Sequence, residues 1–153
     1  MKLALRYGLM ITAVVVAWVL FTRFLFPLGP DSRANVLAPI LFNLTAFVAI
    51  YLGVRARKEE LAGDLSFKDG LNTGMSISLV YALTSSLFFA ILLFVMGPRL
   101  LAHEPTALGA PVWQVAALAF AGMLVGSFVF GVIYSTVISF MLAKRRPREL
   151  PIK

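Results

Sequence analysis

Residues 70–96 read GLNTGMSISLVYALTSSLFFAILLFVM and contain no charged side chain. An α-helix needs roughly 20 predominantly apolar residues to cross the ~30 Å hydrocarbon layer of a bilayer, and this run is longer than that. Only a structure that pairs its own backbone N–H and C=O groups is stable in lipid, and a single segment does so as a helix. The run therefore predicts a membrane-spanning helix.

Three further apolar runs of similar length cover about residues 7–26, 34–54 and 112–143. Proline and glycine interrupt the chain after the first run, at Pro27 and Pro30, and after the third, at Gly97 and Pro98. These residues end helices because proline lacks an N–H and glycine has a flexible backbone. The first run is too long for the apolar core of a signal peptide, and no small-x-small cleavage site follows it. The sequence predicts an all-α integral membrane bundle of four transmembrane helices, in one domain over residues 1–153.

The overall composition supports a membrane protein. Charged residues make up 14% of the chain, the hydrophobic set makes up 60%, and the mean hydropathy is +0.90. A soluble domain carries about 25% charged residues. The net charge of +7 lies in short clusters at the ends of the apolar runs, a pattern that orients membrane proteins and differs from the basic stripe of a nucleic-acid binder. We therefore expect contact with membrane lipid and none with nucleic acid.

Lysine and arginine are divided unequally between the two sides that four spans create. Eleven lie on the side that holds both chain ends, and three lie on the other. The eleven are Lys2, Arg6, Arg55, Arg57, Lys58, Lys68, Lys144, Arg145, Arg146, Arg148 and Lys153. Short loops rich in lysine and arginine stay in the cytoplasm. We therefore expect a bacterial inner-membrane protein with both termini cytoplasmic, a cytoplasmic loop over residues 55–69 and a basic cytoplasmic tail over residues 144–153.

Ser66 and Asp69 form a Ser-x-x-acid pattern just before the third apolar run. The Ser66 hydroxyl can accept a hydrogen bond from the backbone N–H three residues later, and a carboxylate in the first turn interacts favourably with the helix dipole. The third helix is therefore expected to begin at about Ser66, ahead of the apolar run itself.

Small residues recur every four positions in the last two runs. The third run carries Gly70, Gly74, Ser78, Ala82 and Ser86. The fourth carries the Gly-x-x-x-Gly pair Gly122 and Gly126, and then Ser127-x-x-x-Gly131. Small side chains let helix backbones approach closely in lipid. These residues predict helix packing, either inside the monomer or between copies of the chain, with close crossings at Gly74 and Gly126.

A polar stripe marks the second run. Asn35, Pro39 and Asn43 recur every four residues and so share one helix face. One interpretation is a kinked surface that lines a path for a polar substrate. The simpler interpretation, which we favour, is a proline kink with Asn43 hydrogen-bonded to a neighbouring helix.

The spans contain no chemically reactive centre. Ionisable residues in the middle of a membrane span mark proton or ion pathways, and these runs have none. The single histidine, His103, stands beside Glu104 in a connection, and one such pair is too few ligands for a metal site. The absence of cysteine excludes thiol chemistry and cysteine-ligated metals. We therefore expect no enzyme activity, no catalytic residues, no cofactor and no bound metal.

Short motifs around the second connection are similar to those of one known family. They read Gly-Val-Arg at 53–55, Gly-Asp-Leu-Ser-Phe at 63–67 and Gly-Met-Ser-Ile-Ser at 74–78, with Leu-Arg-Tyr-Gly at 5–8. Over nearly its whole length the chain resembles the domain-of-unknown-function family 4199, which consists of small four-helix bacterial membrane proteins. That family has no assigned activity, so the resemblance implies the topology and no site residues.

Taken together, these features predict an uncharacterised, non-catalytic membrane protein that acts through helix–helix contacts. It would be an accessory or assembly subunit that binds other membrane proteins, or a subunit that associates with itself. The alternative is a small transporter or channel for an apolar or weakly polar solute.

Overall fold

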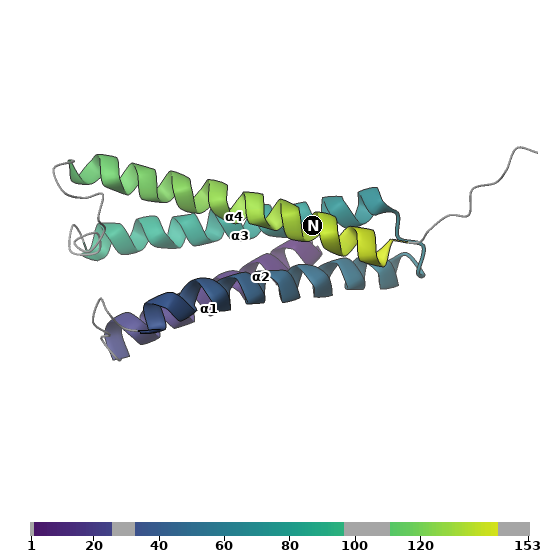
Figure 1. Ribbon diagram of the computed structural model, residues 1–153, viewed down its shortest axis with the longest axis horizontal. Helices are drawn as coiled ribbons and strands as arrows, with labels where there is room; N and C mark the ends of the chain where they lie inside the picture. The colour runs from purple at the N-terminus through teal and green to yellow at the C-terminus, as the bar shows by residue number, and fades with distance from the viewer. Residues whose placement is uncertain (1, 26–32, 97–110, 144–153) are drawn as a thin grey trace, which may run out of the picture.

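The computed structural model describes residues 2–25, 33–96 and 111–143. In this part of the chain every regular element is helical (Figure 1). The elements are α1 (Lys2–Leu20), a π-helical continuation (Phe21–Leu25), α2 (Arg33–Glu60), α3 (Phe67–Met96) and α4 (Val112–Leu142). Among these described residues, four helices are long and apolar enough to cross a membrane, as the sequence predicts. The chain is an all-α, multi-pass membrane protein.

The helix α2 extends six residues beyond the end of its apolar run, so residues 55–60 are helical where the sequence analysis expects a loop. Arg55 Nε lies 3.2 Å from Glu59 Oε1, and Arg57 Nη1 lies 2.8 Å from Glu60 Oε2. Arginine, lysine and glutamate are good helix formers, and ion pairs between residues three or four positions apart stabilise a helix. The apolar run therefore marks the lipid-compatible part of α2 and understates the helix.

The turn after α2 ends the helix with two backbone hydrogen bonds. The N–H of Gly63 donates to the Lys58 carbonyl at 2.9 Å, and the N–H of Ala62 donates to the Glu59 carbonyl at 3.1 Å. Ala62 and Gly63 both have positive φ, 49° and 88°. This is the Schellman pattern, which satisfies the free carbonyls at a helix end.

The cap expected at the start of α3 is confirmed. The N–H of Asp69 donates to Ser66 Oγ at 3.1 Å, and the Ser66 hydroxyl in turn contacts the Asp69 carboxylate. Because α2 ends late and α3 starts at Phe67, the connection between them is only six residues long. A tight connection of this kind holds the two helix ends together.

Helix α3 packs against each of the other three helices. Figure 1 shows α3 and α4 side by side along one edge and α2 along the other, with the two edges closer together at the end that carries the α2–α3 turn. The buried core gathers at that same end and includes Ile50, Val54, Leu65, Ile77 and Ile138. We call this the closed half of the bundle, and we call the half that contains Pro39, Gly122 and Gly126 the open half.

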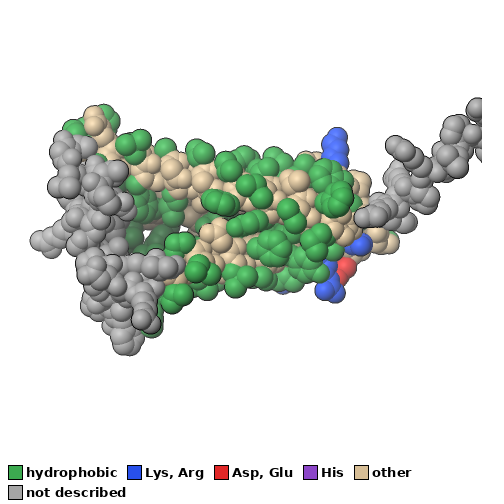
Figure 2. All heavy atoms as spheres, viewed as in Figure 1, with side chains coloured by type: hydrophobic (Ala, Val, Ile, Leu, Met, Phe, Trp, Pro, Cys, Tyr) green, Lys and Arg blue, Asp and Glu red, His purple; other side chains and the backbone are tan. Residues whose placement is uncertain are grey.

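The outer surface of the bundle is apolar along its length. Large side chains such as Leu87, Phe94, Leu118 and Phe140 are exposed. Figure 2 shows hydrophobic side chains over all the helices in view, with lysine, arginine and acidic side chains gathered at one end. A surface of this kind is stable in contact with lipid tails and unstable in water.

Candidate functional site

The closed half joins α3 to α4 through two reciprocal contacts between a serine and a glycine. Ser135 of α4 lies over Gly74 of α3, and Ser78 of α3 lies over Gly131 of α4. A Cβ atom added at either glycine would overlap the facing serine side chain. Each serine is bonded within its own helix, Ser78 Oγ to the Gly74 carbonyl at 2.9 Å and Ser135 Oγ to the Gly131 carbonyl at 2.6 Å. The close approach expected at Gly74 is therefore present.

One turn nearer the start of α3 and the end of α4, Gly70 faces Ser139. A Cβ atom at Gly70 would lie 2.7 Å from Ser139 Oγ. Ser139 is fully buried, and its hydroxyl has no hydrogen-bond partner among the described residues. Further along α3, Ala82 is buried as well. The ladder Gly70, Gly74, Ser78 and Ala82 thus lies on a buried face of α3.

Within the described part of the single chain, no close helix crossing is made at Gly126, where one was predicted, or at Gly122. A Cβ atom added at either residue would meet no atom within 4 Å. The reason is geometric, because a cavity lined by residues of α2, α3 and α4 lies beside these two glycines. Of the glycines expected to pack, Gly70, Gly74 and Gly131 meet another helix, while Gly122 and Gly126 border free space.

The polar stripe on α2 leads to the same cavity. Asn43 Nδ2 donates to the Pro39 carbonyl at 2.8 Å, and the Tyr134 hydroxyl donates to Asn43 Oδ1 at 2.8 Å. Asn43 thus joins α2 to α4, which agrees with the simpler of the two interpretations of the stripe. The side chain of Asn35 lies outside the described residues, as does the His103–Glu104 pair.

A cavity of about 450 Å³ lies between α2, α3 and α4. Ligand pockets usually have volumes of 300–1,000 Å³, and in helical bundles they form between helices. Its apolar walls include Phe42, Ala46, Ile50, Met123 and Phe130, and none of the described lining residues is charged. In Figure 2 the surface is hollowed between the two edges of the bundle.

Polar atoms reach the cavity from all three helices. Asn43, Ser78, Tyr81, Ser127 and Tyr134 belong to its lining. Tyr81 of α3 and Ser127 of α4 contribute hydroxyl groups to the same cavity. The cavity is thus mostly apolar, with a few hydroxyls and one amide at fixed positions.

A groove on the outer surface lies next to the cavity, and the hydrogen-bonded pair Asn43 and Tyr134 lines both. Pro39, Asn43 and Tyr134 line both spaces, and Ile40, Leu44 and Phe47 complete the groove. Ile40 and Leu44 are each 60% exposed, so the groove faces the surroundings of the bundle. The Asn43–Tyr134 bond therefore lies between the cavity and the lipid-facing surface.

The motifs of the first three helices match one protein family. A family model described as a protein of unknown function (DUF4199) matches residues 6–103, which is more than half of the chain. The chain belongs to this family. No curated protein and no solved structure matches it.

The DUF4199 match is shorter than the resemblance predicted from the sequence, because it ends before α4. Asn43, Ser78 and Tyr81 lie inside the matched residues, whereas Tyr134 and the glycines of α4 lie outside them. The family match therefore includes two of the three walls of the cavity.

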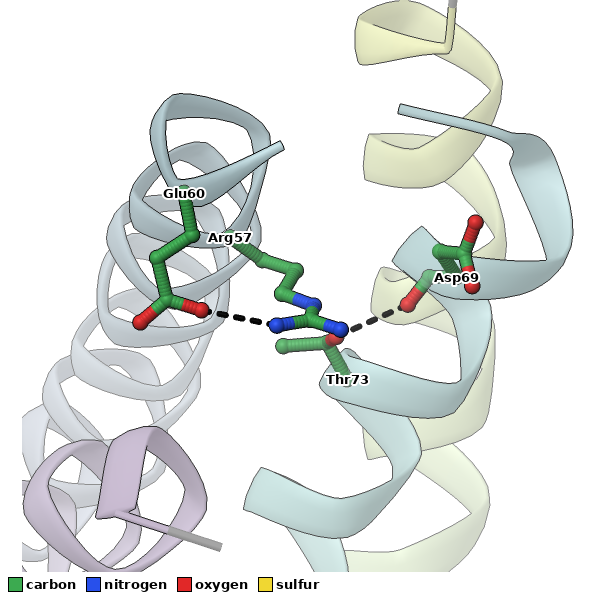
Figure 3. Close-up of polar contacts among 4 residues, drawn as sticks. All are labelled: Arg57, Glu60, Asp69 and Thr73. Atoms are coloured by element: carbon green, nitrogen blue, oxygen red, sulfur yellow. Dashed lines mark hydrogen bonds and ion pairs between the residues drawn. The ribbon is translucent and has the colours of Figure 1, made fainter. Parts of the chain in front are cut away.

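The charged end of this DUF4199 protein forms a second, polar hollow of about 380 Å³. Figure 3 shows the Arg57 side chain between Glu60 of α2 and the first turns of α3, where the Thr73 hydroxyl donates to the Asp69 carbonyl at 2.8 Å. The side chains of Arg57 and Glu60 are about half exposed, and solvent-exposed ion pairs add little to stability. This end is a solvated charged face.

Neither the hydropathy nor the small-residue spacing of the sequence singles out the two tyrosines of the cavity, Tyr81 and Tyr134. Aromatic residues in membrane helices usually mark the interfaces at the span ends. These two lie well inside α3 and α4, where a hydroxyl must find a partner because lipid offers none. That position is the signal that points to a polar site within the bundle.

Proposed function

We propose that this protein is a non-catalytic subunit of the bacterial inner membrane that acts through helix–helix contacts made by α4. The observation that carries the proposal is the unequal burial of the spans. Only 6% of an 18-residue apolar window of α4 is buried inside the chain, against 28–33% of the corresponding windows in the other three spans. In lipid, helices associate through close van der Waals packing, and most of this window of α4 has no such packing within the described part of the chain.

The partner is another membrane protein or a second copy of this chain. The exposed face of α4 includes Leu118, Val125, Val129 and Ile133, which are all apolar. A transmembrane helix with a matching apolar surface could cover this face and replace lipid without burying a charge.

We further propose that both termini are cytoplasmic, because of the eleven-to-three division of lysine and arginine. Reporter fusions after Lys153 and within residues 101–109 are expected to read opposite sides of the membrane. A fusion after Lys153 that reads the outside would contradict this orientation.

Site-directed photocrosslinking tests the subunit role. The chain has no cysteine, so one cysteine can be placed at Val125 of α4 or, as a matched control, at the equally apolar and comparably exposed Leu83 of α3. Each carries a maleimide–benzophenone, and native membranes are irradiated. We expect a discrete product of higher mass from Val125→Cys and none from Leu83→Cys. Identical smears from both positions would mean that α4 meets only lipid.

A second candidate function is a small transporter or channel for an apolar or weakly polar solute, and the cavity is the observation that favours it. Purification from native membranes separates the two candidates. A larger complex of constant composition supports the subunit role. A chain that purifies alone and carries a weakly polar solute, such as a short-chain diol, into liposomes faster than it enters protein-free liposomes supports transport.

A further inference from the structure

We propose that the cavity between α2, α3 and α4 is a binding site for one neutral, membrane-soluble amphiphile. The apolar body of the amphiphile occupies the cavity, and its hydroxyl or carbonyl group bonds to Asn43 and Tyr134. The site is independent of the subunit role proposed for α4, because it involves the face of α4 that points into the bundle.

The lining restricts the ligand to uncharged molecules. No described residue of the cavity wall carries a charge that could compensate an ionic group. Transferring a charge into such surroundings without a partner is strongly unfavourable, because the charge loses its hydration and gains no compensating group. A single apolar chain or ring system with a neutral polar group matches the lining, whereas an ionised fatty acid or a phosphate headgroup does not.

The Asn43–Tyr134 pair retains hydrogen-bonding capacity. One N–H of the Asn43 amide is bonded to the Pro39 carbonyl, and Asn43 Oδ1 accepts from Tyr134. The second amide N–H has no partner among the described residues, and the Tyr134 oxygen can still accept a bond. A donor and an acceptor side by side suit a hydroxyl group, which uses both, or a carbonyl, which uses the donor.

The groove supplies a route from the bilayer. It shares Pro39, Asn43 and Tyr134 with the cavity, and its other walls, Ile40, Leu44 and Phe47, are apolar. A molecule dissolved in lipid can therefore reach the Asn43–Tyr134 bond sideways, between α2 and α4. No passage through a charged surface is needed.

The free volume of the cavity depends on glycine. Gly122 and Gly126 line the cavity, and a side chain added at either begins in open space. Gly126→Leu should therefore fill the cavity without a clash, which gives a variant that removes the site and retains the fold. Ala121→Leu is the matched control, because Ala121 is an exposed residue of α4 outside the lining.

Photolabelling tests the proposal on the full chain, purified and reconstituted in phosphatidylcholine vesicles. The probe is hexadecanol that carries a diazirine, and the labelled peptides are identified by mass spectrometry. We expect labelling of α2 and α4 near Asn43 and Met123 that saturates and is competed by plain hexadecanol. Gly126→Leu should lower it at least tenfold, and Ala121→Leu should leave it unchanged.

Two further arms identify the chemistry that is recognised. Asn43→Leu removes the bond to the head group and should weaken competition by hexadecanol roughly three- to tenfold, as expected for one hydrogen bond. Diazirine-bearing palmitate at pH 9 and diazirine-bearing phosphatidylcholine should label the same peptides far more weakly. Labelling that does not saturate, that persists in Gly126→Leu, or that is equal for the charged probes would overturn the proposal. So would a Gly126→Leu chain that fails to fold while Ala121→Leu folds, because the free space would then not exist.

Discussion

Glycine has opposite surroundings in the closed and open halves of the bundle, because it contacts a neighbouring helix in one and borders a cavity in the other. In the closed half, Gly74 and Gly131 are notches that the serines of the facing helix fill. In the open half, Gly122 and Gly126 are four residues apart on α4, as Gly70 and Gly74 are on α3, but no described residue would contact a Cβ atom added at either. Small residues at four-residue spacing therefore predict a helix face without large side chains. Whether another helix packs against that face depends on the path of the neighbouring helices.

The short connection between α2 and α3 accounts for the closed half. Leu65 of this connection is completely buried in the core, beside Val54 and Ile77. The capped start of α3 at Ser66 follows directly. Because the chain is anchored at this end, the helices are packed here and are free to diverge toward Pro39 and Gly122.

The largest effect is expected where the closed half has no spare room. Gly131→Ala adds a methyl group against the Ser78 side chain and should lower the free energy of unfolding by about 1–3 kcal/mol. Adding Ser78→Gly to the same chain removes the obstacle, so most of the loss should be recovered. Unfolding in mixed detergent micelles measures both. Losses that simply add would show that the two residues do not touch.

A smaller effect is expected at the bond that joins the two sides of the open half. Tyr134→Phe removes the hydroxyl that donates to Asn43 Oδ1 and should cost about 0.6–1.5 kcal/mol, as is usual for such bonds in membrane proteins. A double-mutant cycle with Asn43→Leu isolates the pair, and a coupling of similar size is expected. A coupling of zero would mean that the bond does not hold α2 to α4.

The smallest effect, of opposite sign, is expected at Ser139. Its buried hydroxyl has no partner among the described residues, so Ser139→Ala should leave stability unchanged or raise it by up to about 1 kcal/mol. Ser78→Ala is the control, because that hydroxyl is bonded to the Gly74 carbonyl. The same unfolding assay applies. A clear loss at Ser139 would reveal an additional partner for the hydroxyl.

Much of the fold follows from the sequence because lipid imposes one strong rule. Long uncharged runs must be helices, so four helices and the cap at Ser66 could be predicted. The true end of α2 at Glu60 could not be predicted from hydropathy, because arginine and glutamate prolong the helix through propensity and paired charges. Hydropathy indicates whether a segment lies in lipid or in water, and it does not indicate where the helical backbone ends.

The candidate site could be predicted only in part. Asn43 stands out as an amide within an apolar helix, and its need for a partner follows from that position. Its partner Tyr134 is 91 residues away, and helical periodicity does not reveal which face of α4 meets α2. The spacing of Gly122 and Gly126 resembles that of Gly70 and Gly74, so their different surroundings depend on tertiary structure alone.

The most direct test of the contrast between the halves compares Gly74→Leu with Gly126→Leu in one unfolding assay. The sequence alone predicts that both substitutions destabilise the bundle. The structure predicts a loss of about 1–3 kcal/mol or more for Gly74→Leu, because Ser135 and Ile50 occupy the space, and a change within about 0.5 kcal/mol for Gly126→Leu. Equal losses of stability at the two positions would contradict the claim that free space lies beside Gly126, and would therefore contradict the cavity.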